Sequence, residues 1–152
     1  MSRARLEVEI DAPAGVVMVV VTDFERYPAF LPWMQAAAVL RHEHPAPGDP
    51  GEAWEVRFQV EVIRPLVYTL RLEREGVSAL RWSLVEGVFR ANDGAWLLAP
   101  LDEGRRTLAT YEIELQTGSF VPTHILRSLV GRDLPELLQR VKAEAERRGA
   151  GA

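Results

Sequence analysis

The sequence predicts an α+β protein built on one antiparallel sheet of six or seven strands, with two short helices after the first strand and a long C-terminal helix. Alternating apolar and polar residues recur at hairpin spacing between residues 39 and 115, with no helical segment among them. This pattern argues against a parallel, doubly wound sheet. Helix signals are confined to the chain before this region and to residues 122–148.

The length of the chain fits a single domain. Its 152 residues, 47% of them hydrophobic, can bury one core and are too few for two domains of ordinary size. We therefore expect one domain over residues 1–152, with a disordered tail at about 149–152. No basic leader with an apolar segment opens the sequence, and its longest apolar run is far below the ~20 residues that span a bilayer. The expected location is cytoplasmic.

The first strand and the helix after it are predicted from residues 5–15. Residues 5–10, "RLEVEI", alternate apolar and charged side chains as a half-buried strand does. Asp11 as N-cap with Pro13 in the first turn then predicts the start of a helix. The valine-rich run that follows favours a strand by propensity, and we take the cap as the stronger signal.

Two further short helices are predicted in residues 22–33, "TDFERYPAFLPW". Thr22 and Glu25 have the spacing of a capping box, which predicts a helical turn just after Thr22. Pro28 is placed to start the next turn. This stretch also gathers an unusual number of apolar side chains, and the sequence alone raises the question of what they cover.

The sheet is predicted from Val39 onward. The segment 45–51, "PAPGDPG", is predicted to be a loop, and the strand after it places one dry face opposite one wet face. Breaks at 74–78, 87–94 and 99–106 separate further strands. The inward faces of the long strands are Trp54, Val56, Phe58, Val60 and Val62; Tyr68, Leu70 and Leu72; Leu80, Trp82 and Leu84; Trp96 and Leu98; and Ala109, Tyr111, Ile113 and Leu115.

The C-terminal helix is predicted over residues 122–148. Asp133 and Glu136 form a D-x-x-E capping box around Pro135, so the helix should kink or restart there. Gly131 loosens the same turn. The apolar stripe along the helix is Leu126, Val130, Leu134, Leu137, Val141 and Ala145.

Two motifs carry a resemblance that covers essentially the whole chain. "DFERYPAFLPW" at 23–33 and "GVFRANDGAWLLAP" at 87–100 resemble segments of the START-like (SRPBCC) superfamily. They are similar to its polyketide cyclase/dehydrase-type branch, which includes coenzyme Q-binding proteins and ribosome-association toxins. The resemblance implies a helix-grip fold, in which a curved sheet wraps the C-terminal helix and leaves a cavity for an apolar small molecule.

The cavity implied by the resemblance gives the apolar stretch at 22–33 a role as a lid over one end. Each aromatic residue taken singly is equally well explained as core. The candidate ligand-binding residues are Phe24, Tyr27, Phe30, Trp33, Phe58, Tyr68, Trp82, Phe89, Trp96, Tyr111, Leu126, Val130 and Leu134.

Three functions are compatible with this resemblance. The first is binding or transport of a hydrophobic small molecule such as a lipid, an isoprenoid quinone or a polyketide-like compound. The second is an enzyme of the polyketide cyclase or aromatase kind, against which the scarcity of ionisable groups on the dry faces argues. The third is an interaction protein of the ribosome-association type. Asp133 could act as a general base on a pocket rim, but capping explains it more simply.

Other classes of site have little support in the sequence. The chain has no cysteine, and His42 and His44 lack a third ligand, so we predict no metal, no cofactor and no catalytic residue. A formal net charge of −4 argues weakly against nucleic acid as a partner. Association with a ribosome and transient contact with a membrane stay open, and the sequence does not determine the oligomeric state.

Overall fold

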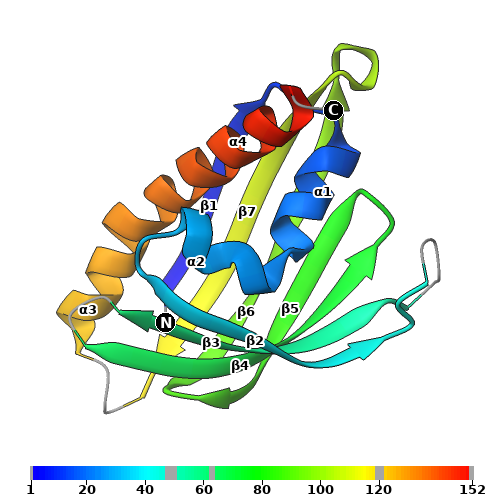
Figure 1. The fold of residues 1–152 in the computed structure, drawn as a ribbon. Coiled ribbons are helices and arrows are strands. Elements are labelled where there is room, and N and C mark those ends of the chain that lie inside the picture. The colour runs from blue at the N-terminus through cyan, green and yellow to red at the C-terminus, as the bar shows by residue number, and fades with distance from the viewer. Residues whose placement is uncertain (1, 47–50, 62–63, 119–121, 151–152) are drawn as a thin grey trace.

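The computed structural model describes residues 2–46, 51–61, 64–118 and 122–150. Seven strands form one antiparallel sheet in the order β1-β7-β6-β5-β4-β3-β2, which confirms the predicted class (Figure 1). The predicted loop at 45–51 lies between β2 and β3, and most of it falls outside the described residues. The strands are β1 Ser2–Ile10, β2 Met34–Glu43, β3 Ala53–Glu61, β4 Pro65–Glu75, β5 Ala79–Gly87, β6 Phe89–Leu101 and β7 Arg106–Thr117.

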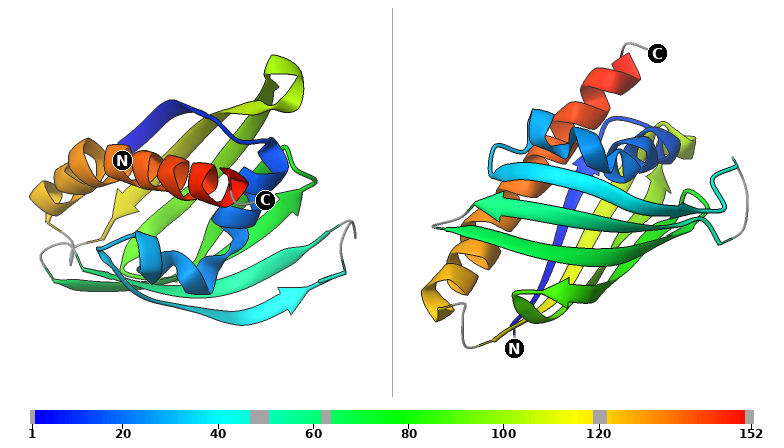
Figure 2. Two further views of the ribbon diagram at one scale, coloured as in Figure 1. Left: turned by 45° about the horizontal axis from the view of Figure 1, so that its top comes forward. Right: turned by 60° about the horizontal axis from the view of Figure 1, so that its bottom comes forward.

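Helices α1, α2 and α4 lie on the concave side of the sheet, and η2 forms the turn between β6 and β7. Figures 1 and 2 show the sheet curving around α4, with α1 and α2 beside it, so the helix-grip fold is confirmed. Helix α4 continues to Ala150, so the disordered tail expected from residue 149 is wrong for its first two residues. The helical elements are α1 Ala14–Thr22, η1 Phe24–Arg26, α2 Tyr27–Phe30, η2 Asp102–Gly104, α3 Thr123–Ser128, η3 Leu129–Asp133 and α4 Leu134–Ala150.

The dry faces of the strands are buried as the alternation predicts. On β3, Trp54, Val56, Phe58 and Val60 are buried, and Val62 lies outside the described residues. The break predicted at 87–94 is too long, because β6 already begins at Phe89. Side-chain bonds explain why "ANDG" stays in a strand, since the Asn92 and Asp93 oxygens accept hydrogen bonds from β5.

Helix α1 begins at a different cap from the one predicted. Pro13 is its N-cap residue, and no side chain caps the helix there. The backbone N–H of Asp11 instead donates to Glu146 Oε2 of α4, at 2.9 Å. The valine-rich run is helical against its propensity because four of its residues, including Val17 and Val20, are buried under the sheet and α4.

The predicted capping box at Thr22 is not formed. The Thr22 hydroxyl donates to the Met18 carbonyl oxygen at 2.7 Å, and Glu25 Oε2 accepts from the Val39 backbone N–H at 3.1 Å. The two short helices predicted after Thr22 are nonetheless present as η1 and α2. Glu25 therefore ties η1 to β2 and leaves the start of η1 uncapped by a side chain.

The C-terminal helix contains one turn of π-helix, the element η3. In a regular α-helix the ring of Pro135 would clash with the carbonyl of Gly131, and the wider turn at Leu129–Asp133 lies where that clash would occur. The irregularity predicted at Pro135 is thus present one turn earlier. The backbone stays helical through Leu134, so no new helix begins at Asp133 and the predicted capping role of Asp133 is wrong.

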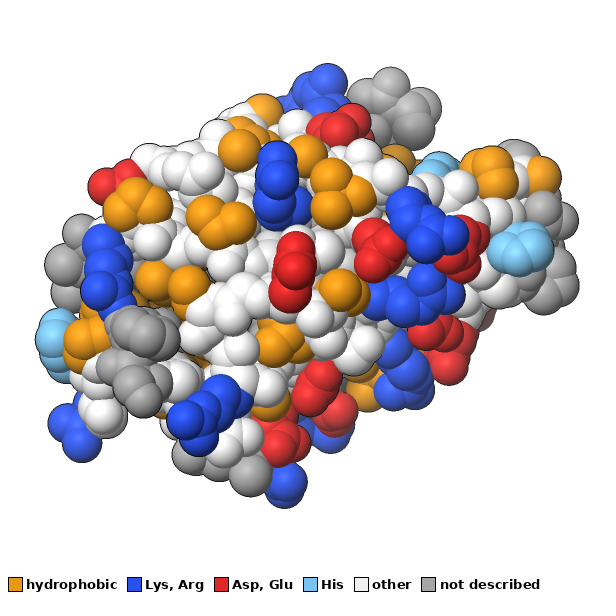
Figure 3. Space-filling view, turned by 90° about the horizontal axis from the view of Figure 1, so that it is seen from below, with side chains coloured by type: hydrophobic (Ala, Val, Ile, Leu, Met, Phe, Trp, Pro, Cys, Tyr) orange, Lys and Arg blue, Asp and Glu red, His pale blue; other side chains and the backbone are white. Residues whose placement is uncertain are grey.

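The outer surface of the sheet carries charges of both signs. Figure 3 looks onto this side of the molecule, where basic and acidic side chains are interspersed. Arg71 bridges β4 and β2 through Glu43, at 3.1 Å, and Arg41 approaches Glu55 of β3 at 3.8 Å. Within the described ranges, no helix is long and apolar enough to cross a membrane.

An ion pair fastens the end of α4 to the segment that covers the concave side, residues 23–33, here called the cover segment. Arg148 Nη1 donates to Asp23 Oδ2 at 3.0 Å, and Arg148 Nε donates to Glu144 Oε2 at 2.7 Å. The side chains of Arg148 and Asp23 are 20% and 29% exposed. This partial burial makes the pair stronger than one at the open surface.

We expect Asp23→Asn and Arg148→Met each to lower the free energy of unfolding by about 1–2 kcal/mol, because each removes the partly buried ion pair between the cover segment and α4. Arg147→Met is the control, since the Arg147 side chain is 66% exposed and its loss should change stability by less than about 0.5 kcal/mol. Chemical denaturation measures all three variants. Equal losses in the three would show that the Arg148–Asp23 pair does not fasten the cover segment.

Candidate functional site

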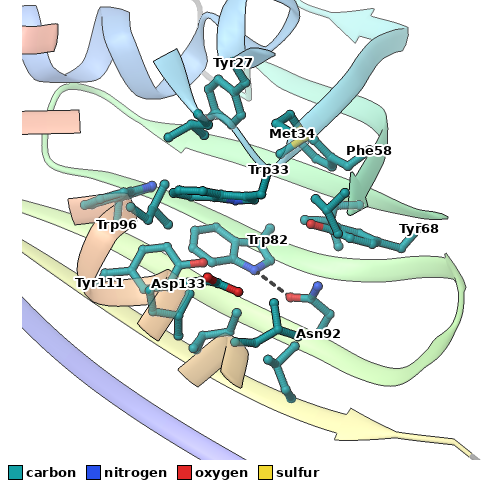
Figure 4. A pocket seen from close by; sticks show the side chains of 18 of the residues that line it. Tyr27, Trp33, Met34, Phe58, Tyr68, Trp82, Asn92, Trp96, Tyr111 and Asp133 are labelled. Carbon is teal, nitrogen blue, oxygen red and sulfur yellow. Dashed lines mark hydrogen bonds between the residues drawn. The ribbon is translucent and has the colours of Figure 1, made fainter. Parts of the chain in front are cut away.

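A cavity lies between the inner face of the sheet, the cover segment and the helical layer of η3 and α4. The volume of the cavity is about 120 Å³. Its wall is mostly apolar, with aromatic rings from five strands and from the cover segment (Figure 4). The arrangement follows from the curvature of the sheet, because the inward side chains of the outer strands tilt toward α4.

Nine of the thirteen candidate residues line this cavity. They come from the cover segment, from β3 to β7 and from α4, and Figure 4 shows most of them converging on one space. Strand parity had assigned five of the nine, Phe58, Tyr68, Trp82, Trp96 and Tyr111, to inward faces. The nine are Tyr27, Trp33, Phe58, Tyr68, Trp82, Phe89, Trp96, Tyr111 and Leu134.

Phe24, Phe30, Leu126 and Val130 do not line the cavity, contrary to the prediction. Phe24 is fully buried behind it, with its ring centre 5.3 Å from that of Trp54. Phe30 packs edge-on against Tyr27 and is only half-buried.

The π-turn explains the error at the helix. In a π-turn, the residue five positions before Leu134, which is Leu129, lies on the same inner face as Leu134. In a regular α-helix, the residue four positions before it, Val130, would lie there. Leu129 therefore lines the cavity in place of Val130. Leu126 is buried in α3 but lies off the cavity wall.

Most of the aliphatic wall and two polar residues, Asn92 and Asp133, are absent from the predicted ligand-binding residues. The aliphatic residues of the strands share the inward faces already assigned, so the period-2 pattern could have found them. Asn92 lies in the predicted break at 87–94. Asp133 has capping as its simpler predicted role, beside a possible role as general base on a pocket rim. The missed residues are Leu31, Met34, Val60, Leu70, Leu72, Leu80, Asn92, Ile113, Leu115, Leu129, Asp133, Leu137 and Val141.

Trp82 lies at the centre of the wall and is held by two neighbours. Its indole Nε1–H donates to Asn92 Oδ1 at 3.2 Å, and both residues are buried. Gly94, opposite Trp82 in the sheet, leaves room for the ring, since a Cβ atom there would lie 2.6 Å from it. The ring centre of Tyr111 is 5.3 Å from that of Trp82, so the aromatic wall is continuous.

Asp133 places a carboxyl group in this aromatic surrounding. The residue is 9% exposed and lines the cavity from the π-turn. Its Oδ1 accepts from Arg132 Nε at 3.2 Å, whereas Oδ2 has no hydrogen-bond partner among the described residues. In Figure 4 the carboxylate lies near Tyr111, Trp82 and Asn92. The cavity therefore combines apolar walls with one acidic group.

Three phenols also reach the cavity, and they are the only tyrosines of the chain. Burial raises the pKa of Tyr27, Tyr68 and Tyr111 well above the ordinary 10.0, because the phenolate is poorly solvated there. The pKa of Tyr111 is raised further by its proximity to the other two. The Tyr27 hydroxyl donates to the Val21 carbonyl oxygen, which holds the cover segment against α1.

The histidines do not contribute to the cavity. His42 Nε2 is 2.9 Å from Glu52 Oε2, and its ring stacks on Trp54 at 4.9 Å. His124 lies at the exposed start of α3. In the described part of the chain, no three His, Cys, Asp or Glu side chains come close enough together to hold a metal ion.

Comparisons with known proteins agree with this geometry. The family described as "Polyketide cyclase / dehydrase and lipid transport" matches residues 10–142. The fold is similar to the ZhuI aromatase/cyclase from Streptomyces sp. R1128, with 21% identity, coverage of 97% of this chain and 94% of that chain, and a TM-score of 0.83. A comparison with curated proteins finds no match.

Two further solved structures share the fold over their whole length. A START superfamily protein from Mycobacterium smegmatis is 22% identical, over 95% of this chain and 97% of that chain, with a TM-score of 0.79. An 18 kDa protein from Caulobacter crescentus is 21% identical, over 100% of both chains, with a TM-score of 0.78. These similarities establish the fold.

We expect the three tyrosines to resist ionisation until the protein unfolds. Their pKa values are raised in the folded state, so above pH 10 the unfolded chain loses protons that the folded chain keeps. The free energy of unfolding should then fall with rising pH, by up to about 1.4 kcal/mol per pH unit for each tyrosine. Phenolate absorbance and circular dichroism should change together in one alkaline transition.

A gradual titration centred on pH 10 with unchanged circular dichroism would contradict this assignment. Tyr68→Phe is the matched variant, because it removes one phenol and keeps the ring. It should lower the amplitude of the absorbance change by about a third, and the change should still coincide with unfolding.

Proposed function

Because the chain belongs to the polyketide cyclase/dehydrase and lipid transport family, we propose that it binds or carries a hydrophobic small molecule in the cavity between the sheet and α4. The observation that carries this proposal is the cavity itself, an apolar, aromatic space with few polar groups. Such a lining is typical of sites that bind small apolar ligands. A lipid, an isoprenoid quinone and a polyketide-like compound all fit this chemistry.

The rigidity of the wall supports a ligand site. Tyr68 and Phe89 pack edge to face at 5.3 Å, and Trp96 and Tyr111 do so at 4.9 Å. Aromatic side chains lose few rotamers when they order, so a wall built from them offers much contact area at low entropic cost. The cover segment contributes Tyr27 and Trp33 and closes part of the space beside α4.

A polyketide cyclase or aromatase is the second candidate, and Asp133 is the observation that favours it. The sequence argument against an enzyme was the scarcity of ionisable groups on the dry faces, and Asp133 is an ionisable group on the inner face of the helix. A buried carboxyl beside phenolic hydroxyls can move protons on a bound molecule. Binding of a small molecule remains the leading proposal, because Asp133 can act on a molecule only after the cavity has bound it.

We test binding by adding the same large side chain at two adjacent positions of η3. Leu129→Trp should fill the cavity and weaken binding of the neutral fluorescent dye N-phenylnaphthylamine by about tenfold or more. Val130→Trp is the matched control, since Val130 packs on the core but does not line the cavity. Val130→Trp should leave dye affinity within about twofold of the parent, whatever its cost from overpacking, roughly 1–3 kcal/mol.

Fluorescence titration measures the dye affinity, and thermal unfolding shows that each variant folds. The free energy of unfolding of Leu129→Trp should change less than that of Val130→Trp, because the added ring enters existing space. A parent protein that does not bind the dye would contradict the proposal, and so would a Leu129→Trp variant that binds it as well as the parent.

A further inference from the structure

The carboxylate of Asp133 is the feature of the cavity that purely hydrophobic binding leaves unused. Its Oδ1 faces Arg132, a side chain that is 72% exposed at the rim. Its Oδ2 is buried, and within the described residues it accepts no hydrogen bond. One oxygen of the group is therefore paired at the rim, the other is buried without a partner among the described residues, and the residue lines the cavity.

Asp133 is not explained by the stability of the fold. A buried polar atom without a hydrogen bond costs free energy, and a carboxylate costs more than a neutral group. The helical backbone continues through this position, so the side chain caps no helix. An apolar residue would suit the neighbours Leu129, Leu134 and Leu137 better.

The other polar groups of the cavity need a hydrogen-bond donor from a ligand less than the Asp133 carboxylate does. The indole N–H of Trp82 is already taken by Asn92 Oδ1. Tyr68 and Tyr111 also line the cavity, and each carries a hydroxyl group. A hydroxyl can donate or accept, whereas an ionised carboxylate can only accept. Asp133 is therefore the group that most requires a donor from the bound molecule.

We propose that the cavity selects apolar aromatic ligands that carry a hydroxyl or N–H group, and that this donor bonds to Asp133 Oδ2. The flat rings of Trp82, Tyr111 and Trp96 provide the surface on which the aromatic part of the ligand packs. This inference rests on the proposed binding function and adds to it the chemical class and the orientation of the ligand.

The test compares naphthol with its methyl ether, which has the same ring and the same oxygen but no donor. Isothermal titration calorimetry on the whole protein should give an affinity for naphthol about tenfold higher than for the ether, as expected when the ether leaves a buried acceptor unpaired. Asp133→Leu should bind both compounds with equal affinity. Asp133→Asn keeps the size of the side chain and should retain only part of the preference.

Glu136→Gln is the control, because Glu136 lies one turn away on the exposed side of α4 and pairs with Arg140 at 2.8 Å. It should keep the full preference for naphthol. Thermal unfolding accompanies each variant, and Asp133→Leu should unfold at the parent temperature or above, since it removes an unpaired buried oxygen. Should the leucine variant not fold, the inference is tested by comparing Asp133→Asn, which should lose part of the preference for naphthol, with Glu136→Gln, which should keep all of it.

Three results would overturn the inference, and the third would also contradict the proposed binding function. Equal affinities of the parent protein for naphthol and the ether, or an unchanged preference after the loss of the Asp133 carboxylate, would overturn the selection of donors and leave hydrophobic binding intact. A parent protein that binds neither compound would contradict the proposed binding function as well.

Discussion

One long helix has to cover the concave face of a seven-stranded sheet, and the structure depends on how this mismatch is met. Seven strands about 4.8 Å apart span roughly 29 Å, whereas a helix with its side chains is about 10–12 Å across. The sheet curves toward α4 to reduce the uncovered area, and α1 and the cover segment occupy part of the rest (Figure 2). The space that remains is the cavity.

The same mismatch accounts for the composition of the cavity wall. Small side chains would leave the gap wider, and inward positions around the cavity carry large rings such as Trp82, Trp96 and Tyr111. These rings need support from behind, which Gly94 and Asn92 provide to Trp82 through close approach and a hydrogen bond. Asp133 opposes this trend, because it places in the same wall a carboxylate oxygen without a hydrogen-bond partner among the described residues, and the proposed bond to a ligand would account for its presence.

The sequence was informative where a local pattern determines the structure. Period-2 alternation gives the face of each side chain on a strand, so Phe58 and Tyr111 could be assigned to the interior before the structure was known. Sequence patterns failed where contacts between distant segments determine the structure. Asn92 reads as a turn residue until its bond to the neighbouring strand is seen, and the displacement of Val130 by Leu129 follows from a π-turn that helical periodicity does not contain.

The four tryptophans offer the most direct test of the cavity as a binding site. Trp33, Trp82 and Trp96 line it, whereas Trp54 lies outside it, stacked on His42, and serves as an internal reference. In a nitrogen–proton correlation spectrum titrated with naphthol, the indole signals of the three cavity residues should shift in a saturable manner, and that of Trp54 should stay in place. Unmoved cavity signals, or a Trp54 signal that shifts as much as they do, would contradict binding in this cavity.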